Sequence, residues 1–111
     1  MRPEYPSIPQ SPTLQELQVY QAAICKLRGW DQTSDLATFL LFAEEVGELA
    51  KAIRNRINLY QEKGKVVDPG ELKGEMADVL SYLMELANRF EVDLTDAYRE
   101  KEARNADREY E

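Results

Sequence analysis

Apolar residues recur every three or four positions along most of this 111-residue chain, which is the spacing of one face of an α-helix. Four such stretches are each preceded by a residue typical of a helix N-cap: Thr13, Ser34, Asp68 and Asp93. Gly29 ends the first stretch, and the second extends to about Lys63. The alternation typical of a β-strand does not compete with this pattern. We therefore expect an all-α protein built as a four-helix bundle.

The second and third predicted helices differ in how their apolar residues are arranged. The second has one seam with nearly strict heptad spacing, which consists of Leu36, Leu40, Ala43, Val46 or Gly47, Ala50, Ile53, Ile57 and Tyr60. The third is apolar on two faces, one with Leu72, Met76, Val79, Leu83, Leu86 and Phe90, the other with Ala77, Leu80, Met84 and Ala87. Four short helices offer few surfaces to cover both faces, so at least a homodimer is expected.

The first twelve residues place a proline at every third position: Pro3, Pro6, Pro9 and Pro12. This spacing puts the proline rings along one edge of a polyproline II helix. We interpret residues 1–12 as an N-terminal arm that packs along its own or a neighbouring bundle, rather than as a ligand of a proline-binding module. Residues 13–111 are long enough for one domain.

Composition narrows the possible chemistry. The chain carries 14 lysines and arginines against 21 acidic residues, a net charge of −7, which disfavours duplex nucleic acid as a partner. Histidine is absent and Cys25 is the single cysteine, so a Ser-His-Asp triad, a Cys-His pair, a zinc site with His or Cys ligands and an internal disulfide are excluded. We expect Cys25 to be a small hydrophobic helix residue. No apolar run is long enough for a signal peptide or a membrane span, so a cytoplasmic location is expected.

Acidic residues interrupt the apolar seams of the second and third helices. Glu45 and Glu48 are three residues apart, as are Glu75 and Asp78, so each pair lies on one helix face. If the two pairs converge, the repulsion among their four carboxylates has to be compensated by divalent cations. Mg²⁺ prefers an all-oxygen shell of this kind. Spacing alone leaves open a second interpretation, in which these acids form solvated helix faces. A di-iron carboxylate bundle is disfavoured because its Glu-x-x-His pairs need histidine.

The residues around these acids favour the metal-binding interpretation. Glu45-Val46-Gly47-Glu48-Leu49-Ala50 and Glu75-Met76-Ala77-Asp78-Val79-Leu80 resemble the ExxE and ExxD signature of the MazG-like all-α nucleoside triphosphate pyrophosphohydrolases. Similarity to the dCTP pyrophosphatase branch extends from about Leu17 to Tyr110 and includes Arg28-Gly29-Trp30-Asp31 and Val92-Asp93-Leu94. Both motifs on consecutive helices, with these flanks, are more specific than a lone ExxE.

The resemblance implies that Glu45, Glu48, Glu75 and Asp78 bind Mg²⁺, for which Mn²⁺ can substitute, and that one of them helps to activate water. It implies hydrolysis of a nucleoside triphosphate, of ribose or deoxyribose type, to the monophosphate and pyrophosphate. The implied assembly is a homodimer or homotetramer, and the implied role is removal of surplus or non-canonical nucleotides. Two alternatives remain open: a phosphoribosyl-ATP pyrophosphohydrolase, and a non-catalytic helical module that dimerises or binds a partner.

Substrate contacts are also implied on the fourth helix. Lys101, Asn105 and Arg108 lie on one stripe, and the first two match family residues that contact phosphate or sugar. A salt-bridging surface stripe is the alternative interpretation.

Three further positions correspond to family residues near the substrate. Tyr82 matches a substrate-side tyrosine, Trp30 a base-stacking tryptophan and, more weakly, Gln21 a base-pocket histidine. Packing in the core is the alternative for Tyr82 and Trp30. Asn55 stands where the family has a second pocket tryptophan, which leaves the preferred base open.

Overall fold

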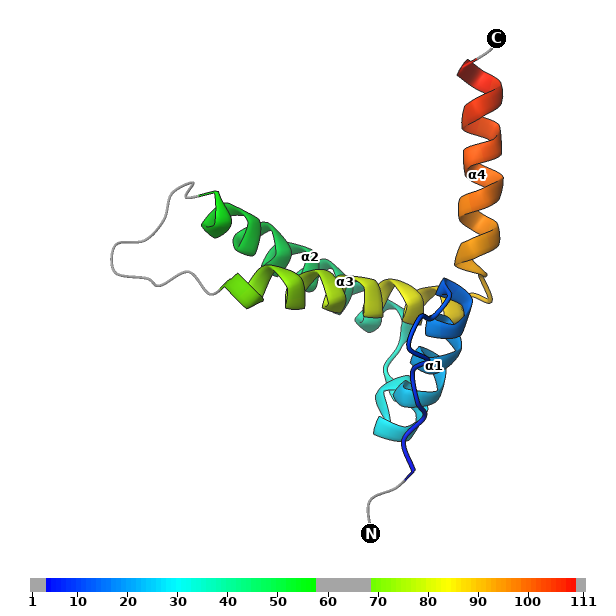
Figure 1. Cartoon of the computed structure of the whole chain (residues 1–111). Coiled ribbons are helices and arrows are strands. Elements are labelled where there is room, and N and C mark those ends of the chain that lie inside the picture. The colour runs from blue at the N-terminus through cyan, green and yellow to red at the C-terminus, as the bar shows by residue number, and fades with distance from the viewer. Residues whose placement is uncertain (1–3, 58–68, 110–111) are drawn as a thin grey trace. The chain divides into compact units, whose positions relative to one another are not determined.

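The computed structural model describes residues 4–57 and 69–109. It contains a short 3-10 helix, η1 (Trp30–Gln32), and four α-helices: α1 (Leu14–Arg28), α2 (Asp35–Arg56), α3 (Pro69–Arg89) and α4 (Leu94–Glu109) (Figure 1). Within the described residues there is no β-strand. The all-α prediction is therefore confirmed. None of the helices in the described ranges is long and apolar enough to cross a membrane.

The helices begin where the capping residues predict. The Glu16 amide donates to Thr13 Oγ1 over 3.1 Å while the Thr13 amide donates to Glu16 Oε1 over 3.0 Å, which completes the capping box of α1. Gly29 ends α1 with a φ of 77°, a left-handed conformation that glycine adopts without a Cβ clash. Ser34 and Asp93 accept from the backbone amides of Ala37 and Asp96, respectively.

Two boundaries differ from expectation or lie beyond the described residues. The helix expected to extend to about Lys63 ends at Arg56, and the Ile57 amide still donates to the Ile53 carbonyl over 3.0 Å. Asp68, the expected N-cap of the third helix, and Tyr60 of the predicted seam lie outside the described residues, whereas α3 begins at Pro69 as predicted.

The described residues divide into two compact units. The first unit combines residues 4–32 with 84–109, and the second combines 33–57 with 69–83, so α3 contributes to both. In the first unit the buried apolar side chains are Ile24 and Cys25 of α1 with Met84 and Ala87 of α3. Cys25 is thus a buried helix residue, as expected. Arm residues Glu4, Tyr5 and Pro6 line a shallow pocket with one side of α1.

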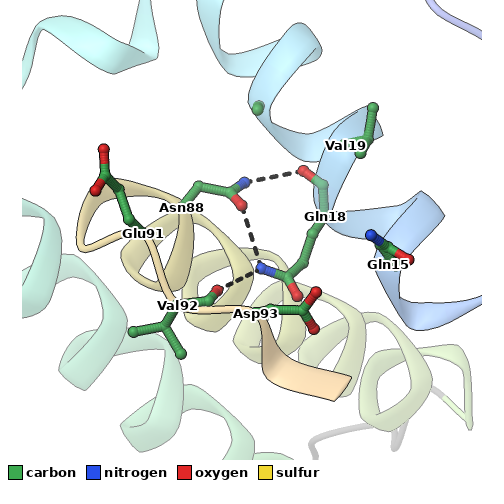
Figure 2. A pocket seen from close by; sticks show the side chains of 8 residues that line it. Gln15, Gln18, Val19, Asn88, Glu91, Val92 and Asp93 are labelled. Carbon is green, nitrogen blue, oxygen red and sulfur yellow. Dashed lines mark hydrogen bonds between the residues drawn. The ribbon is translucent and has the colours of Figure 1, made fainter. Parts of the chain in front are cut away.

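Gln18 connects the elements of the first unit (Figure 2). Its side-chain amide donates to Asn88 Oδ1 over 3.2 Å and to the Val92 carbonyl over 2.9 Å, and its Oε1 accepts from the Leu94 amide over 2.8 Å. The Asn88 amide in turn donates to the Gln18 carbonyl over 2.9 Å. Because Gln18 is only 6% exposed, this network fixes α1 against the turn between α3 and the start of α4.

In the second unit α2 and the first part of α3 run antiparallel as a helical hairpin (Figure 1). On α2 and on the part of α3 in this unit, buried or half-buried side chains recur at alternating spacings of three and four residues. On α2 they are Thr38, Phe42, Glu45, Leu49 and Ala52, and on α3 they are Leu72, Glu75, Val79 and Tyr82. Since Glu45 faces Glu75 across the hairpin, these two stripes form its contact surface.

The α2 seam predicted from sequence is not this contact surface. Its large residues are exposed, from 41% for Ile53 to 69% for Leu36. The spacing of apolar residues along a helix shows where an apolar stripe lies, but not which neighbouring element covers it. In addition, α2 carries a second stripe of heptad spacing beside the first. The hairpin packs through the stripe that holds Glu45, and the more apolar stripe is turned away from α3.

Candidate metal centre

Three carboxylates from the two helices of the hairpin gather at one point. Glu45 projects from α2 and Glu75 and Asp78 from α3, and one oxygen of each lies within 4.8 Å of the others. Glu75 and Asp78 reach the same point because residues three apart lie on one helix face, and Glu45 meets them because it lies on the contact surface of α2. The sequence-based prediction that the two acidic motifs converge is thus supported for three of their four acids.

One carboxylate oxygen of this cluster lacks the partner that a buried polar atom needs. Glu75 Oε2 is buried and accepts no hydrogen bond. Burial raises the pKa of the Glu45 carboxyl above its ordinary value, and the neighbouring Asp78, Glu75 and Glu44 carboxylates raise that pKa further. In the described part of the chain no lysine or arginine forms an ion pair with Glu45, Glu75 or Asp78. The cluster therefore concentrates negative charge without compensation from the protein.

This donor set fits a hard divalent cation. Carboxylate oxygens are the ligands that Mg²⁺ prefers, and it commonly keeps several waters and substrate phosphates in its shell, so three or four carboxylates suffice. A cation would supply the partner that Glu75 Oε2 lacks and would relieve the repulsion that raises the Glu45 pKa. The chemistry open to such a site is activation of water and binding of polyphosphate oxygens.

Glu48 and Tyr82 lie on the same hairpin as the cluster. Glu48 is exposed, one turn along α2 from Glu45, and is not among the three gathered carboxylates. Tyr82 is half-buried on the contact surface of α3, one turn beyond Asp78. The expectations that Glu48 binds metal and that Tyr82 faces the substrate stay predictions.

The candidates Trp30 and Gln21 belong to the first unit. Trp30 is 51% exposed, and the Arg28 guanidinium lies 4.7 Å from its ring centroid, so it is not a core residue. Gln21 is buried and donates from Nε2 to Cys25 Sγ over 3.3 Å. It lines a cavity of about 180 Å³ together with polar residues of α1, η1 and α3: Cys25, Asp31, Glu85, Asn88 and Arg89.

The three candidates on α4 also belong to the first unit. Lys101 and Arg108 are exposed, and Asn105 is half-buried. Their spacing along a regular helix places them on one stripe, as predicted.

Glu85 and Arg89 were not singled out from the sequence. The Arg89 guanidinium donates to Glu85 Oε1 over 3.0 Å and to the Trp30 carbonyl over 3.3 Å, and the Glu85 side chain is only 9% exposed. The i, i+4 spacing of an acid and an arginine on a helix was the available signal. It predicts an ion pair but not that the pair is buried.

Three carboxylates from the two antiparallel helices of the hairpin thus form a group that could hold a metal ion. The family model described as the MazG nucleotide pyrophosphohydrolase domain matches residues 33–109, which cover α2, the acidic cluster, α3 and α4. The chain therefore belongs to the MazG family and is a nucleotide pyrophosphohydrolase. This family typically depends on a divalent metal, and the acidic cluster is a group that could bind one. No curated protein sequence matches the chain significantly.

Proposed function

We propose that the protein hydrolyses nucleoside triphosphates to the monophosphate and pyrophosphate, with Mg²⁺ held by Glu45, Glu75, Asp78 and Glu48. Mn²⁺ can take the place of Mg²⁺, since both accept an all-oxygen shell. The observation that carries the proposal is the buried Glu75 Oε2, which has no hydrogen-bond partner and belongs to a carboxylate gathered with two others. A group this costly to bury is retained where a ligand compensates it.

The residues of the cluster have two tasks in this reaction. The bound metal supplies charge neutralisation of the triphosphate and a lowered pKa for water. The carboxylates orient that water toward the α phosphorus, and one of them accepts its proton during attack. Pyrophosphate leaves from the opposite side of the phosphorus, as in-line displacement requires.

The remaining candidates bind and orient the substrate in this proposal. Lys101 and Asn105 contact phosphate or sugar oxygens, and Arg108 extends that contact. Trp30, half exposed, offers an aromatic face for a base. Gln21 offers an amide inside a polar cavity, and Tyr82 borders the acids on α3.

Pyrophosphate release from a panel of ribo- and deoxynucleoside triphosphates, with and without Mg²⁺, tests the proposal. We expect release that depends on Mg²⁺ and that Asp78→Asn reduces by at least about a thousandfold, because the change removes a ligand charge and keeps the shape. Glu44→Gln is the matched control, since Glu44 is an exposed acid outside the cluster. Wild-type turnover in Asp78→Asn would overturn the metal assignment.

The same panel separates the two alternatives. Adding phosphoribosyl-ATP to the panel tests whether the protein is a phosphoribosyl-ATP pyrophosphohydrolase. That enzyme also releases pyrophosphate, but from phosphoribosyl-ATP rather than from a nucleoside triphosphate. A complete lack of pyrophosphate release with every substrate in Mg²⁺ would favour the second, a non-catalytic helical module. The uncompensated cluster favours catalysis over the non-catalytic module, since a structural helix surface gains nothing from it.

In this proposal the protein removes surplus or non-canonical nucleotides from the nucleotide pool and works in the cytoplasm as a homodimer or homotetramer. The exposed apolar residues of α2 support the oligomer, because water contact with a seam of this length is unfavourable.

A further inference from the structure

The short helix η1 presents Trp30 without packing a side chain of its own into a core. No residue within η1 is buried, and Trp30 is 51% exposed. A 3-10 segment of three residues has few internal hydrogen bonds, so its orientation depends on contacts with the elements around it. The contacts that hold η1 therefore determine where the indole ring of Trp30 lies.

Two arginines contact Trp30, one at its ring and one at its backbone. The Arg28 guanidinium lies 4.7 Å from the ring centroid, which is a cation–π arrangement. This contact is local, because Arg28 ends α1 just before the Gly29 turn. Arg89 Nη2 instead donates to the Trp30 carbonyl over 3.3 Å from the last residue of α3, 59 positions further along the chain. Arg89 thus connects η1 to a second helix.

Glu85 fixes the guanidinium that makes this connection. The same nitrogen, Arg89 Nη2, also donates to Glu85 Oε1 over 3.0 Å, so one group joins α3 to η1. The Glu85 side chain is 9% exposed and the Arg89 side chain 14%. A charge-assisted hydrogen bond with this much burial is stronger than a neutral bond at an open surface. The guanidinium is therefore held in place before it reaches η1.

The contact with Arg89 also lies beside a polar cavity. Asp31, which follows Trp30 in η1, lines the cavity of about 180 Å³ together with Arg89 and Gln21. Trp30 and Gln21 are both candidate contacts of the substrate base. A displacement of η1 would therefore move the aromatic ring and one wall of the cavity at the same time.

We propose that Arg89 is a positioning residue, which holds η1 through the Trp30 carbonyl so that the indole ring is presented to the base of a nucleoside triphosphate. The inference rests on the base-stacking role that the proposed function gives to Trp30. Because every base has an aromatic face, the effect does not depend on which base is bound. Arg89 acts on substrate binding, whereas the acids of the metal centre act on the chemical step.

Steady-state kinetics with the nucleoside triphosphate that is hydrolysed fastest test this role. Arg89→Met should raise KM by about three- to tenfold, because the ring is correctly placed for a smaller fraction of the time, and should change kcat by less than about twofold. Trp30→Ala should raise KM by about tenfold or more. In the Trp30→Ala background Arg89→Met should raise KM no further, because it acts through the ring. Additive effects of the two substitutions would contradict the proposal.

Two further variants separate positioning from stability. Arg89→Lys is the conservative rescue, because its ammonium can donate to both oxygens, and its KM should stay within about twofold of the wild type. The double variant Glu85→Gln, Arg89→Met leaves no unpaired charge but still lacks the donor to the Trp30 carbonyl. Its KM should stay as high as that of Arg89→Met. A wild-type KM in the double variant would show that Arg89 acts only through stability.

Inorganic tripolyphosphate is the matched ligand without a base. As a competitive inhibitor in Mg²⁺ it should bind the wild type, Trp30→Ala and Arg89→Met equally, within about twofold, because it makes no stacking contact. Weaker inhibition of Arg89→Met would mean that the substitution damages the phosphate site, and the positioning role would be wrong.

Fluorescence tests the contact without any substrate. Trp30 is the single tryptophan of the chain, so its anisotropy and its quenching by acrylamide report on η1 alone. Arg89→Met should lower the anisotropy and increase the quenching at unchanged helicity, and Arg89→Lys should match the wild type. Wild-type anisotropy and KM in Arg89→Met, with a raised KM in Trp30→Ala, would overturn the positioning role alone. An unchanged KM in Trp30→Ala would instead overturn the base-stacking role in the proposed function, and this inference with it.

Discussion

The two units of the chain hold buried carboxylates in different environments. In the first unit, Glu85 Oε1 lies 3.0 Å from the Arg89 guanidinium, so its charge is compensated within the protein. In the α2–α3 hairpin, the carboxylates of Glu45, Glu75 and Asp78 lie within 4.8 Å of one another, and no cationic side chain of the described residues pairs with them. Each arrangement holds a carboxylate away from water, but Glu85 has a charged partner there, whereas Glu75 Oε2 has none.

This difference separates a structural arrangement from a functional one. Glu85, Arg89 and the Gln18 network join elements of the first unit through satisfied hydrogen bonds, and each bond opposes unfolding. The acidic cluster opposes folding, because its charges repel one another. Substitutions in the two regions should therefore change stability in opposite directions.

The largest expected effect is a loss of catalytic activity when a carboxylate of the hairpin is substituted. Glu75→Gln should lower kcat/KM by about a thousandfold or more, because it removes a ligand charge from the centre of the cluster. The metal-free melting temperature should stay unchanged or rise, because the change removes the buried carboxylate that has no partner. Pyrophosphate release and thermal unfolding in a chelator measure the two quantities. A large loss of metal-free stability would show that the cluster stabilises the fold, as the Glu85–Arg89 pair does.

Gln18→Ala should have the opposite signature in the first unit. The change removes three partly buried side-chain hydrogen bonds, to Asn88, Val92 and Leu94, and leaves their polar atoms without that partner. We expect a loss of about 2 to 4 kcal/mol in the free energy of unfolding, measured with urea. Gln15→Ala is the control, since Gln15 is an exposed glutamine on the same helix and should change stability by less than about 0.5 kcal/mol. Equal effects of the two variants would show that the network does not hold the unit together.

Sequence information is sufficient for features set by neighbouring residues. The starts of α1, α2 and α4 follow from Thr13, Ser34 and Asp93, because a cap acts within one helical turn. The alignment of Glu75 with Asp78 was predictable for a related reason, since residues three apart lie on one helix face.

Features that depend on distant residues were not predictable in this way. Gln18 contacts Asn88 and Leu94, which are 70 and 76 residues away, so a local pattern contains no sign of its role. Which stripe of α2 packs on α3 could not be predicted for the same reason. Two heptad stripes coexist on α2, and burial of the more polar one depends on which side chains α3 presents.

Removal of the compensating charge should make Glu85 resemble the acidic cluster. Arg89→Met leaves the largely buried Glu85 carboxylate without its 3.0 Å partner, and we expect a loss of about 1 to 3 kcal/mol in the free energy of unfolding. The double variant Glu85→Gln, Arg89→Met should recover part of this loss, because no unpaired charge remains. Urea unfolding of the wild type and the three variants gives the coupling energy. A coupling energy near zero would mean that Arg89 does not compensate the charge of Glu85. The proposed difference between the two units would then be wrong.

The smallest expected effect concerns the reactivity of Cys25, which lies in the first unit and is 3% exposed. Burial raises the pKa of the Cys25 thiol, the Glu85 carboxylate raises it further, and the Arg89 guanidinium opposes that increase. A raised pKa lowers the thiolate fraction at pH 8, so alkylation should be at least about tenfold slower in the folded protein than in urea. Arg89→Met should move the pH midpoint of alkylation upward, since the charge that lowers the pKa is lost. Val19→Cys in a Cys25→Ser background is the exposed control and should react at the unfolded rate. If Arg89→Met leaves the midpoint unchanged, the guanidinium does not compensate the charge beside Cys25.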